Sequence, residues 1–306
     1  MAVDEIPKSV EYPLGTGMRY ESPESIEGAV ALLANSGAAR ILAGGTDLLV
    51  QLRAGMIEPE LLVDIKSIQE ARQITSENGG YRVGAAVSGA ELGEHAALKQ
   101  TWPGVVEAVE LIGSTQIQGR ASLGGNLCNA SPAADGVPAL IAAAALCTIA
   151  GPEGQREVAV EEICTGPGQT SLGKGEFVVS FFFPERAPRS GDAYLRFIPR
   201  TEMDIAVVGA GVNLSLNESG VCSAARVALG AVAPTTMLVP EAGAALVGTR
   251  LDDADLQAMA AAASAACKPI DDKRGTVEYR VKVAGVLARR ACAIAFERAL
   301  ERARNS

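Results

Sequence analysis

The sequence has very few of the residues from which metal centres are built. Its 306 residues include a single histidine, His95, and six cysteines at positions 128, 147, 164, 222, 267 and 292, without any C-x-x-C pair. Because zinc sites and iron–sulfur clusters need clustered Cys and His ligands, we expect this chain to hold no metal. Dispersed cysteines are typical of buried thiols in a reducing compartment, not of a disulfide framework.

The signatures of several catalytic classes are also absent. The chain has no G-x-S-x-G elbow, no H-E-x-x-H helix, no G-x-x-x-x-G-K-[ST] loop and no G-x-G-x-x-G that opens a helix after a strand. Hydrolase, metalloprotease, P-loop and Rossmann interpretations therefore have no support. His95 lies in a polar segment away from every glycine loop, where we expect a solvated surface residue. We assign no catalytic residue and consider instead a bound cofactor.

Basic residues are fewer than acidic ones. The chain carries 27 basic against 36 acidic residues, a net charge of -9, which repels nucleic acid and anionic membranes. Aromatic residues make up only 4% and hydrophobic residues 48%, which is enough for about two domains with cores of small aliphatic side chains. The first residues lack the pattern of a secretory signal, and no uncharged run is long enough to be a convincing membrane span. We expect a cytoplasmic protein.

What the sequence does contain is two glycine loops rich in polar groups. The stretch 121–132, ASLGGNLCNASP, is followed by Asp135, and the stretch 43–48 reads AGGTDL. One Gly-Gly pair alone is more often a structural turn. Two such loops, flanked by the hydroxyls of Thr46 and Ser122, could each form a nest of backbone N–H groups and together hold the pyrophosphate of a dinucleotide.

The periodicity of apolar residues predicts a mixed order of helices and strands. Ser22 and Pro23 are the expected N-cap and first residue of the first helix. The Pro- and charge-rich segment 184–192 is the best candidate domain boundary, and three strands after it suggest an antiparallel sheet. The expected helices are 22–36, 48–52, 88–97, 103–112, 252–267 and 277–302, and the expected strands 39–43, 61–65, 81–87, 176–183, 194–198, 206–216 and 222–229, with a buried helix running into a strand over 137–149.

Taken together, the two loops resemble the paired FAD-binding motifs of the medium, flavin-carrying subunit of the molybdenum hydroxylases, the xanthine dehydrogenase and carbon monoxide dehydrogenase family. The resemblance extends over nearly the whole chain and includes the segments 166–170, 194–197 and 200–206. It implies an α+β fold: a two-subdomain FAD-binding domain of the vanillyl-alcohol oxidase (PCMH) type over 1–183, split near residue 60. A C-terminal domain over 190–306, with a three-stranded antiparallel sheet and helices, would follow.

The resemblance also implies a non-covalent FAD site. The first loop would hold the adenosine and pyrophosphate side, and the second the pyrophosphate and ribityl chain. Val178 matches an apolar contact to the ring system and Arg196 a basic residue near the flavin, while Tyr194 either covers the ring or is an ordinary strand aromatic. The full set of expected contacts is Ile41, Leu42, Ala43, Gly44, Gly45, Thr46, Asp47, Leu48, Ile112, Gly113, Ser122, Gly124, Gly125, Asn126, Asp135, Val178, Tyr194 and Arg196.

Two neighbouring features are expected to play no part in binding FAD covalently or directly. Residues 166–170 are interpreted as a structural loop in preference to a direct contact with FAD. Cys128 is expected to be packed and not linked to the flavin.

In functional terms the resemblance implies one subunit of a three-part hydroxylase. A large subunit with a molybdenum cofactor would oxidise the substrate, a small subunit with two [2Fe-2S] clusters would relay the electrons, and the FAD of this chain would pass them to NAD⁺ or another acceptor. The complex would be a hetero-oligomer, for example a dimer of heterotrimers. Two alternatives remain open: a self-sufficient FAD-dependent reductase or oxidase of the same fold, and a flavin-free structural or assembly protein.

Overall fold

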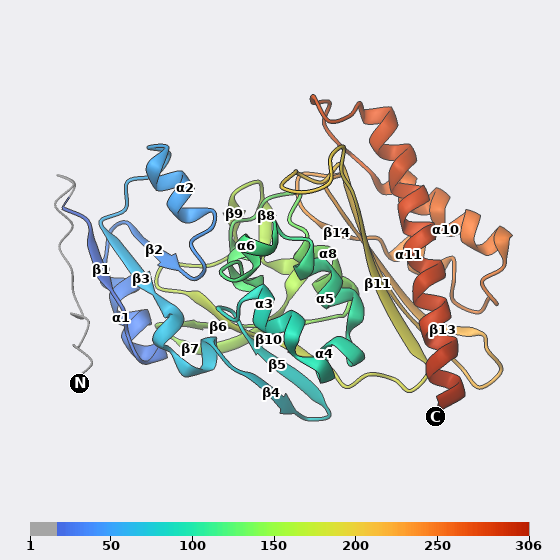
Figure 1. Ribbon diagram of the computed structural model, residues 1–306, viewed down its shortest axis with the longest axis horizontal. Helices are drawn as coiled ribbons and strands as arrows, with labels where there is room; N and C mark the ends of the chain where they lie inside the picture. Colours follow the sequence, from blue (N-terminus) through green and yellow to red (C-terminus); the bar gives the residue numbers. More distant parts are fainter. Residues whose placement is uncertain (1–16, 306) are drawn as a thin grey trace.

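The computed structural model describes residues 17–305, and in this part of the chain three larger sheets follow one another from the N-terminal to the C-terminal side (Figure 1). A fourth sheet has only two short strands, within residues 164–170. The first sheet is parallel, with the order β1-β3-β2, and α1 and α2 accompany it. Its elements are β1 (Arg19–Glu21), α1 (Ile26–Asn35), β2 (Ala39–Leu42), α2 (Leu48–Arg53) and β3 (Leu61–Asp64).

The first helix begins later than the sequence predicts. The N-cap is Ser25, whose hydroxyl accepts a hydrogen bond from the N–H of Gly28 at 3.1 Å. Ser22, which we expected to be the cap, instead shares a hydrogen bond with the hydroxyl of Ser67 at 2.9 Å. Both serines fit an N-terminal signature, and the buried face of the helix, with Ile26 at its start, selects the later one.

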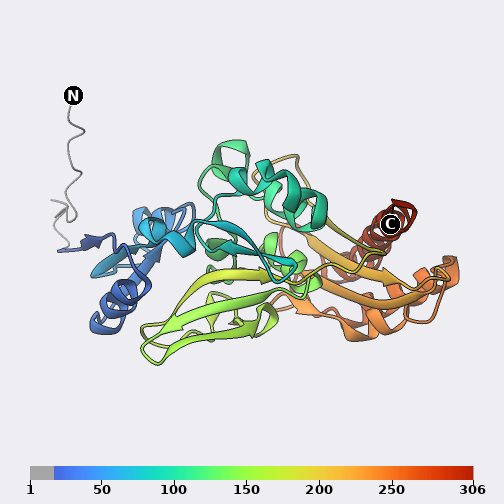
Figure 2. The same ribbon diagram turned by 90° about the horizontal axis from the view of Figure 1, so that it is seen from below.

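The second sheet is antiparallel throughout and has the order β4-β5-β10-β6-β7. Helices of the segment between about residues 89 and 128 lie along one side of it (Figures 1 and 2). The elements are β4 (Ile74–Glu77), β5 (Gly80–Gly84), α3 (Gly89–Glu94), α4 (Ala96–Thr101), α5 (Pro103–Glu110), α6 (Thr115–Gln118), α7 (Leu123–Cys128), α8 (Gly136–Ala142), β6 (Leu146–Gly151), β7 (Gly154–Ala159), β8 (Cys164–Gly166), β9 (Gln169–Thr170) and β10 (Phe177–Phe183), with single 3₁₀ turns at Ile65–Ser67, Gln69–Ala71 and Val160–Glu162.

Two details of this region differ from the expectations. The four-residue strand β4 was not predicted; it is joined to β5 by a turn in which Asn78 and Gly79 have φ of 48° and 76°. His95 is half-buried and not simply solvated, because its Nδ1 accepts a hydrogen bond from the N–H of Leu98 at 3.1 Å and its ring meets Tyr81 edge-on. The histidine is therefore the cap of α4.

The third sheet is antiparallel, with the order β11-β12-β13-β14; the long helix α11 packs on it, and α10 packs against α11 and α9. We expected three strands; the fourth, β14, has two residues, too few to show a periodic pattern. Gly191 allows α11 to approach β11 closely, since a Cβ there would lie 1.9 Å from the carbonyl oxygen of Ala295. The elements are β11 (Ser190–Phe197), β12 (Val208–Leu216), β13 (Cys222–Gly230), β14 (Met237–Leu238), α9 (Pro240–Ala244), α10 (Asp253–Ala266) and α11 (Val277–Asn305).

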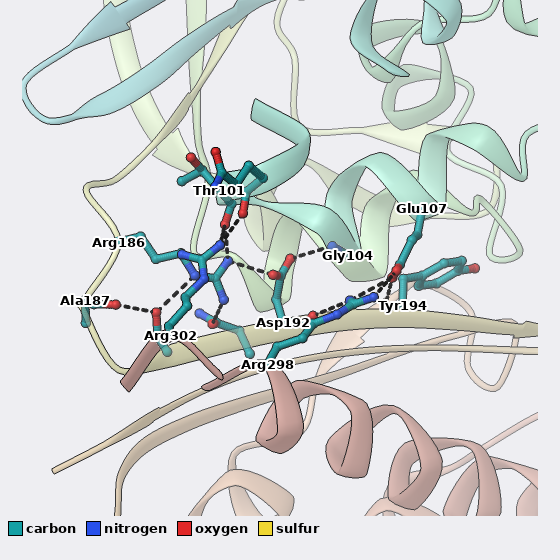
Figure 3. A network of polar contacts seen from close by, with 12 residues as sticks. Thr101, Gly104, Glu107, Arg186, Ala187, Asp192, Tyr194, Arg298 and Arg302 are labelled. Carbon is teal, nitrogen blue, oxygen red and sulfur yellow. Dashed lines mark hydrogen bonds and ion pairs between the residues drawn. The ribbon is translucent and has the colours of Figure 1, made fainter. Parts of the chain in front are cut away.

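A buried polar network joins the second and third sheets (Figure 3). Asp192 of β11 accepts hydrogen bonds from Arg186 at 2.7 Å and from the N–H of Gly104, at the start of α5, at 2.9 Å. The side chains of Asp192 and Arg186 are each only 4% exposed. Arg298 of α11 donates to Glu107 of α5 and to the carbonyl of Asp192. These contacts hold β11 and α11 against α5.

The change from the first sheet to the second falls between Asp64 and Ile74, later than residue 60, where we expected the subdomains to divide. We retain 1–183 and 190–306 as proposed domains, of which residues 1–16 and 306 lie outside the described residues. Among residues 17–305, no helix is long and apolar enough to cross a membrane.

Candidate functional site

A cleft of about 630 Å³ lies where the first sheet meets the second, a volume within the range of small-molecule sites. Its walls come from β2, the loop before α2, the helix α7 and the segment that leads into β10. Thirteen of the residues predicted from the sequence line it: Ile41, Ala43, Gly44, Gly45, Thr46, Asp47, Leu48, Ile112, Ser122, Gly124, Gly125, Asn126 and Val178.

The two glycine loops lie against each other, although about 80 residues separate them. Gly44 is packed so closely on the start of the second loop that a Cβ would lie 1.8 Å from the carbonyl oxygen of Arg120. Gln51 of α2 donates to the side-chain oxygen of Asn129, at the end of α7, at 3.0 Å. The sequence-based expectation of a paired site therefore corresponds to direct contact between the loops.

The first loop has the properties of an anion-binding nest. Within residues 17–305, the backbone N–H groups of Gly44, Gly45, Thr46 and Asp47 donate no hydrogen bond, and Gly45 has a φ of 76°. Lys66 holds the start of this loop in place by donating to the carbonyl of Ala43 at 2.9 Å. Consecutive free N–H groups around a left-handed glycine are suited to a phosphate.

The second loop is not a nest, contrary to our expectation. The N–H of Gly124 donates to the carbonyl of Ala85 at 3.1 Å, and the N–H groups of Gly125 and Asn126 donate to the Ser122 side chain and carbonyl at 3.1 and 2.9 Å. Ser122 is the N-cap of α7, so the contact with Ala85, the cap and the first helical hydrogen bond together engage the N–H groups of Gly124, Gly125 and Asn126. The hydrogen-bond donors that this loop can offer a ligand are on side chains: the hydroxyl of Ser122 and the amide NH₂ group of Asn126.

Five predicted contacts do not line the cleft: Leu42, Gly113, Asp135, Tyr194 and Arg196. Three of them form a buried cluster behind Ile112. Asp135 accepts hydrogen bonds from the Tyr194 hydroxyl and from Arg196, both at 2.9 Å, and Arg196 also donates to the carbonyl of Leu111 at 2.7 Å.

The cluster is charged and deeply buried. Tyr194 is 2% exposed, so its ring has no free face in this arrangement. Burial raises the pKa of Asp135, although the charge and hydrogen bond of Arg196 oppose the shift. Burial and the neighbouring Asp135 raise the pKa of Tyr194 well above its ordinary value. The three residues tie β11 to the segment that carries Ile112 to the cleft.

Cys128 is exposed on the wall of the cleft, where we expected a packed side chain. The surrounding protein disfavours ionisation of the thiol: desolvation, with a smaller contribution from Cys164, raises its pKa to about 12. The thiol is therefore accessible but uncharged at neutral pH.

The cleft also contains many residues that were not predicted from the sequence. Gly168 and Thr170 belong to the loop that we interpreted as structural, and both line the wall. The triplet Gly173-Lys174-Gly175, a lysine between two glycines, was the one signal in the sequence that could have been used. The unassigned residues are Leu33, Ser36, Gly37, Ala39, Arg40, Gln51, Ile57, Ile65, Ala85, Ala121, Cys128, Asn129, Gly168, Thr170, Leu172, Gly173, Lys174, Gly175, Glu176 and Phe177.

No group of three or more His, Cys, Asp or Glu residues within 17–305 is placed to hold a metal ion.

Comparison with known proteins gives consistent matches over both parts of the chain. Residues 16–186 match the FAD binding domain in molybdopterin dehydrogenase, and residues 193–295 match the CO dehydrogenase flavoprotein C-terminal domain. The chain is 37% identical to the carbon monoxide dehydrogenase medium chain of Afipia carboxidovorans, over 94% of this chain and 98% of that one. It is 33% identical to the xanthine dehydrogenase FAD-binding subunit of Escherichia coli O157:H7, over 86% and 90% of the two chains. A chain of reconstituted CO dehydrogenase from Oligotropha carboxidovorans superimposes with a TM-score of 0.87 and 35% identity, covering 91% of this chain and 97% of that one.

Proposed function

The chain belongs to the family of FAD-binding medium subunits of molybdenum hydroxylases, and on this basis we propose that its cleft holds an FAD that carries electrons from partner subunits to an external acceptor. The observation that carries the proposal is the row of free backbone N–H groups at Gly44–Asp47, in a cleft of suitable size. The chain is thus one subunit of an oxidoreductase complex.

The residues of the cleft fit FAD. The free N–H groups of the first loop suit the pyrophosphate, and Ser122 and Asn126 suit the hydroxyls of the ribityl chain. Ile112 and Val178 provide apolar contacts for the ring system. Gly125 leaves room for the cofactor, since the nearest atom to an added Cβ would be the Ser122 hydroxyl at 3.4 Å. When bound, FAD supplies both one-electron and two-electron transfer.

The chain's own residues position the cofactor and do not move protons at a substrate carbon. Of the two acidic groups on the wall, Glu176 is engaged by Arg156 at 3.0 Å, and its pKa is lowered chiefly by that hydrogen bond. Asp47 accepts a hydrogen bond from the side chain of Asn129 at 3.4 Å, and burial raises the pKa of its carboxyl. The thiol of Cys128 stays protonated at neutral pH. The family match favours a role in electron transfer; a self-sufficient reductase needs a poised proton donor, and Asp47 is the one carboxyl of this wall whose pKa is raised.

The partners and the acceptor follow from the family. We propose a small subunit with two [2Fe-2S] clusters as the electron donor, a large subunit with the molybdenum cofactor as the site of substrate oxidation, and NAD⁺ or another acceptor as the destination of the electrons. Relatives named as a medium chain and as a subunit of a dehydrogenase complex support the multi-subunit part. We further propose a dimer of heterotrimers in the cytoplasm.

Purification of the full chain with its accompanying subunits tests the proposal. We expect a yellow protein with stoichiometric FAD, together with iron and molybdenum in the complex, and no substrate turnover by this chain alone. A colourless chain that takes up no added FAD would refute the FAD assignment. An FAD-loaded chain that turns over a substrate without partners would instead support a self-sufficient enzyme.

A further inference from the structure

Three polar side chains gather at one edge of the first sheet. In this parallel sheet β3 lies between β1 and β2, so the strands end at the same edge, where the first glycine loop begins (Figure 1). Asp64 is the last residue of β3, Tyr20 lies on β1, and Lys66 lies in the 3₁₀ turn that follows β3. The carboxyl ends of parallel strands are the usual place for a ligand in such sheets.

These side chains form a series of hydrogen bonds that ends on the first glycine loop. The Tyr20 hydroxyl donates to Oδ2 of Asp64 at 2.7 Å. The Lys66 ammonium donates to the two carboxylate oxygens of Asp64 at 2.7 and 2.8 Å, and to the carbonyl oxygen of Ala43 at 2.9 Å. The side chains of Lys66 and Asp64 are 24% and 8% exposed, so these contacts are largely shielded from water.

The contact between Lys66 and Ala43 sets the direction of one N–H group of the nest. Ala43 and Gly44 share a peptide unit, and no peptide bond in the described part of the chain is cis. In a trans peptide the C=O and the N–H point in opposite directions. Both Ala43 and Gly44 line the cleft, whereas Lys66 does not. Because the Ala43 carbonyl points to Lys66, the free N–H of Gly44 points the other way, into the cleft.

The same contact makes this N–H a stronger donor. A carbonyl oxygen that accepts a hydrogen bond from a cation polarises its peptide unit, and the N–H of that unit then donates more strongly. The second loop fixes the other side of Gly44, where a Cβ would lie 1.8 Å from the carbonyl oxygen of Arg120. The peptide is thus held in place by the protein itself, which lowers the entropy cost of binding a ligand.

We propose that Lys66, held in place by Asp64, is a positioning residue that directs the Gly44 N–H towards the pyrophosphate of FAD. The inference rests on the proposed function and adds to it two residues that do not line the cleft. Lys66 acts through the backbone and does not touch the cofactor. Its removal should therefore weaken ligands that carry a pyrophosphate and spare ligands that have none.

Lys66→Met tests this role, because methionine keeps the apolar stem of the side chain and removes its donors. The flavin-free full chain, with any subunits that purify with it, is titrated with FAD, ADP and riboflavin. ADP has the pyrophosphate without the flavin, and riboflavin has the flavin without phosphates. We expect the affinities for FAD and ADP each to fall about tenfold, the usual effect of one hydrogen bond to a charged group, and the affinity for riboflavin to stay within about twofold.

Two further variants separate positioning from a general disturbance of the fold. Lys66→Arg keeps a cation with N–H donors, so its affinities for FAD and ADP should stay within about threefold of the wild type. Lys99→Met is the same substitution in an ion pair with Glu110 whose side chains are 49% and 39% exposed, and it should change none of the three affinities. The phosphorus NMR signals of bound FAD should shift in Lys66→Met, while the visible spectrum of the flavin stays unchanged.

Failure of this inference is distinguishable from failure of the proposed function. Wild-type protein that takes up neither FAD nor ADP would refute both. Normal binding by the wild type, with unchanged FAD and ADP affinities in Lys66→Met, would refute the positioning role alone. Equal losses of ADP and riboflavin affinity in Lys66→Met, or a loss in Lys66→Arg as large as that in Lys66→Met, would show a general disturbance of the fold and would also overturn the inference.

Discussion

At the residue scale, most glycines of the two loops are required by the backbone of the protein itself, whereas Gly125 leaves space in the cleft for a ligand. A Cβ on Gly44 or Gly124 would lie 1.8 or 2.5 Å from a backbone carbonyl oxygen, so any substitution there disturbs the fold. Gly45 has a positive φ of 76°, which adds strain to every other residue type. Gly125 has neither constraint, so a substitution there can test cofactor binding without straining the backbone.

We expect Gly125→Ala to change stability and cofactor binding in opposite directions. Alanine in place of a glycine in α7 should stabilise the flavin-free protein by about 0.5–1 kcal/mol, because the unfolded chain loses freedom. The added methyl group faces the cleft and should lower FAD affinity at least about tenfold. Thermal unfolding and FAD titration measure the two effects.

A second glycine provides the matched control for this change. Gly119 ends α6, has an ordinary negative φ of −64° and has only the carbonyl oxygen of Gln116, at 4.0 Å, near an added Cβ. It does not line the cleft. Gly119→Ala should leave FAD affinity unchanged, and the interpretation fails if both alanines, or neither, reduce it.

Cys128 allows a prediction about the linkage of the flavin. Because the pKa of its thiol is raised to about 12, only a minute fraction is thiolate at neutral pH, and the thiolate is the reactive form. We expect acid precipitation to release all flavin into the supernatant, and Cys128→Ser to retain FAD. Flavin that stays with the precipitated wild type but not with Cys128→Ser would show a covalent bond to this residue.

Tyr194 was a predicted cover for the flavin ring, and the buried cluster suggests a different role. Tyr194→Phe removes the hydrogen bond to Asp135, so we expect a loss of about 1–2 kcal/mol of unfolding free energy. The visible spectrum of the bound flavin should not change. Tyr279→Phe, at a position 43% exposed, is the control and should change stability by less than about 0.5 kcal/mol. A spectral shift in Tyr194→Phe would restore the role as a ring cover.

At the scale of elements, the sequence predicted best where a pattern is long or where glycines are adjacent. The strand and glycine loop at Ala39–Asp47 and the long helix α11 appear where expected, because periodicity and glycine punctuation are local signals. The strand β14 was missed because two residues carry no period. Both glycine pairs predicted a nest, yet only the tertiary contact to Ala85 and the Ser122 cap decide that α7 lacks one.

Cleft residues from separate segments, such as Ser36, Arg40 and Lys174, could not be found in this way. Ser36 and Arg40 lie in an ordinary helix end and an ordinary strand, and their local sequence has no unusual feature. They share one cleft with Lys174 only because the loop around Lys174, more than 130 residues later, packs against α1. Binding groups assembled from distant segments are set by tertiary packing, and a single sequence records that only indirectly.

The start of α11 depends on an ion pair whose contribution should vary with pH. Arg280 is 3% exposed and donates to Asp272 at 2.7 Å and to the carbonyl of Val207 at 2.8 Å. Desolvation raises the pKa of Asp272, but the N–H of Arg274 and the hydrogen bond and charge of Arg280 outweigh it and bring the value from 3.8 to about 2. The carboxylate is thus the stabilising form, complete above 3.8 and lost as the pH falls through about 2.

We therefore expect Asp272→Asn to lower the unfolding free energy by about 1–2 kcal/mol at neutral pH. The difference from the wild type should shrink as the pH falls from about 4 towards 2, since the carboxyl of the unfolded chain takes up a proton first while the folded carboxyl keeps its charge until the pH approaches 2. Denaturant unfolding at pH 7, 4 and 3 measures this difference directly. Glu218→Gln, at an exposed turn, should show no such trend, and a constant penalty in Asp272→Asn at every pH would contradict the assignment.

At the scale of the whole molecule, the segment that the sequence marked as a boundary is also a point of attachment. Residues 184–192 are rich in proline and charge, which predicted a break between domains. Two of these charged residues, Arg186 and Asp192, are instead buried in the network that joins β11 to α5 (Figure 3). Charge in a linker is usually solvated, so the sequence alone could not show that these charges are paired inside an interface.

This network should determine how firmly the two proposed domains are joined. In Asp192→Asn the guanidinium of Arg186, with its side chain 4% exposed, loses its anionic partner, and breaking such a buried pair typically costs about 3–5 kcal/mol. We expect a clearly lower midpoint of thermal unfolding. The cofactor cleft is built from residues 33–178 and does not include the network, so FAD affinity below the unfolding transition should be retained.

The control is Arg289→Ala, which removes the ion pair between Arg289 and Asp253. Their side chains are 45% and 82% exposed, so the loss should cost no more than about 1 kcal/mol of unfolding free energy. If the two variants unfold at the same midpoint, the buried pair does not hold the domains together; if Asp192→Asn loses FAD while remaining folded, the interface reaches further into the cleft than its contacts indicate.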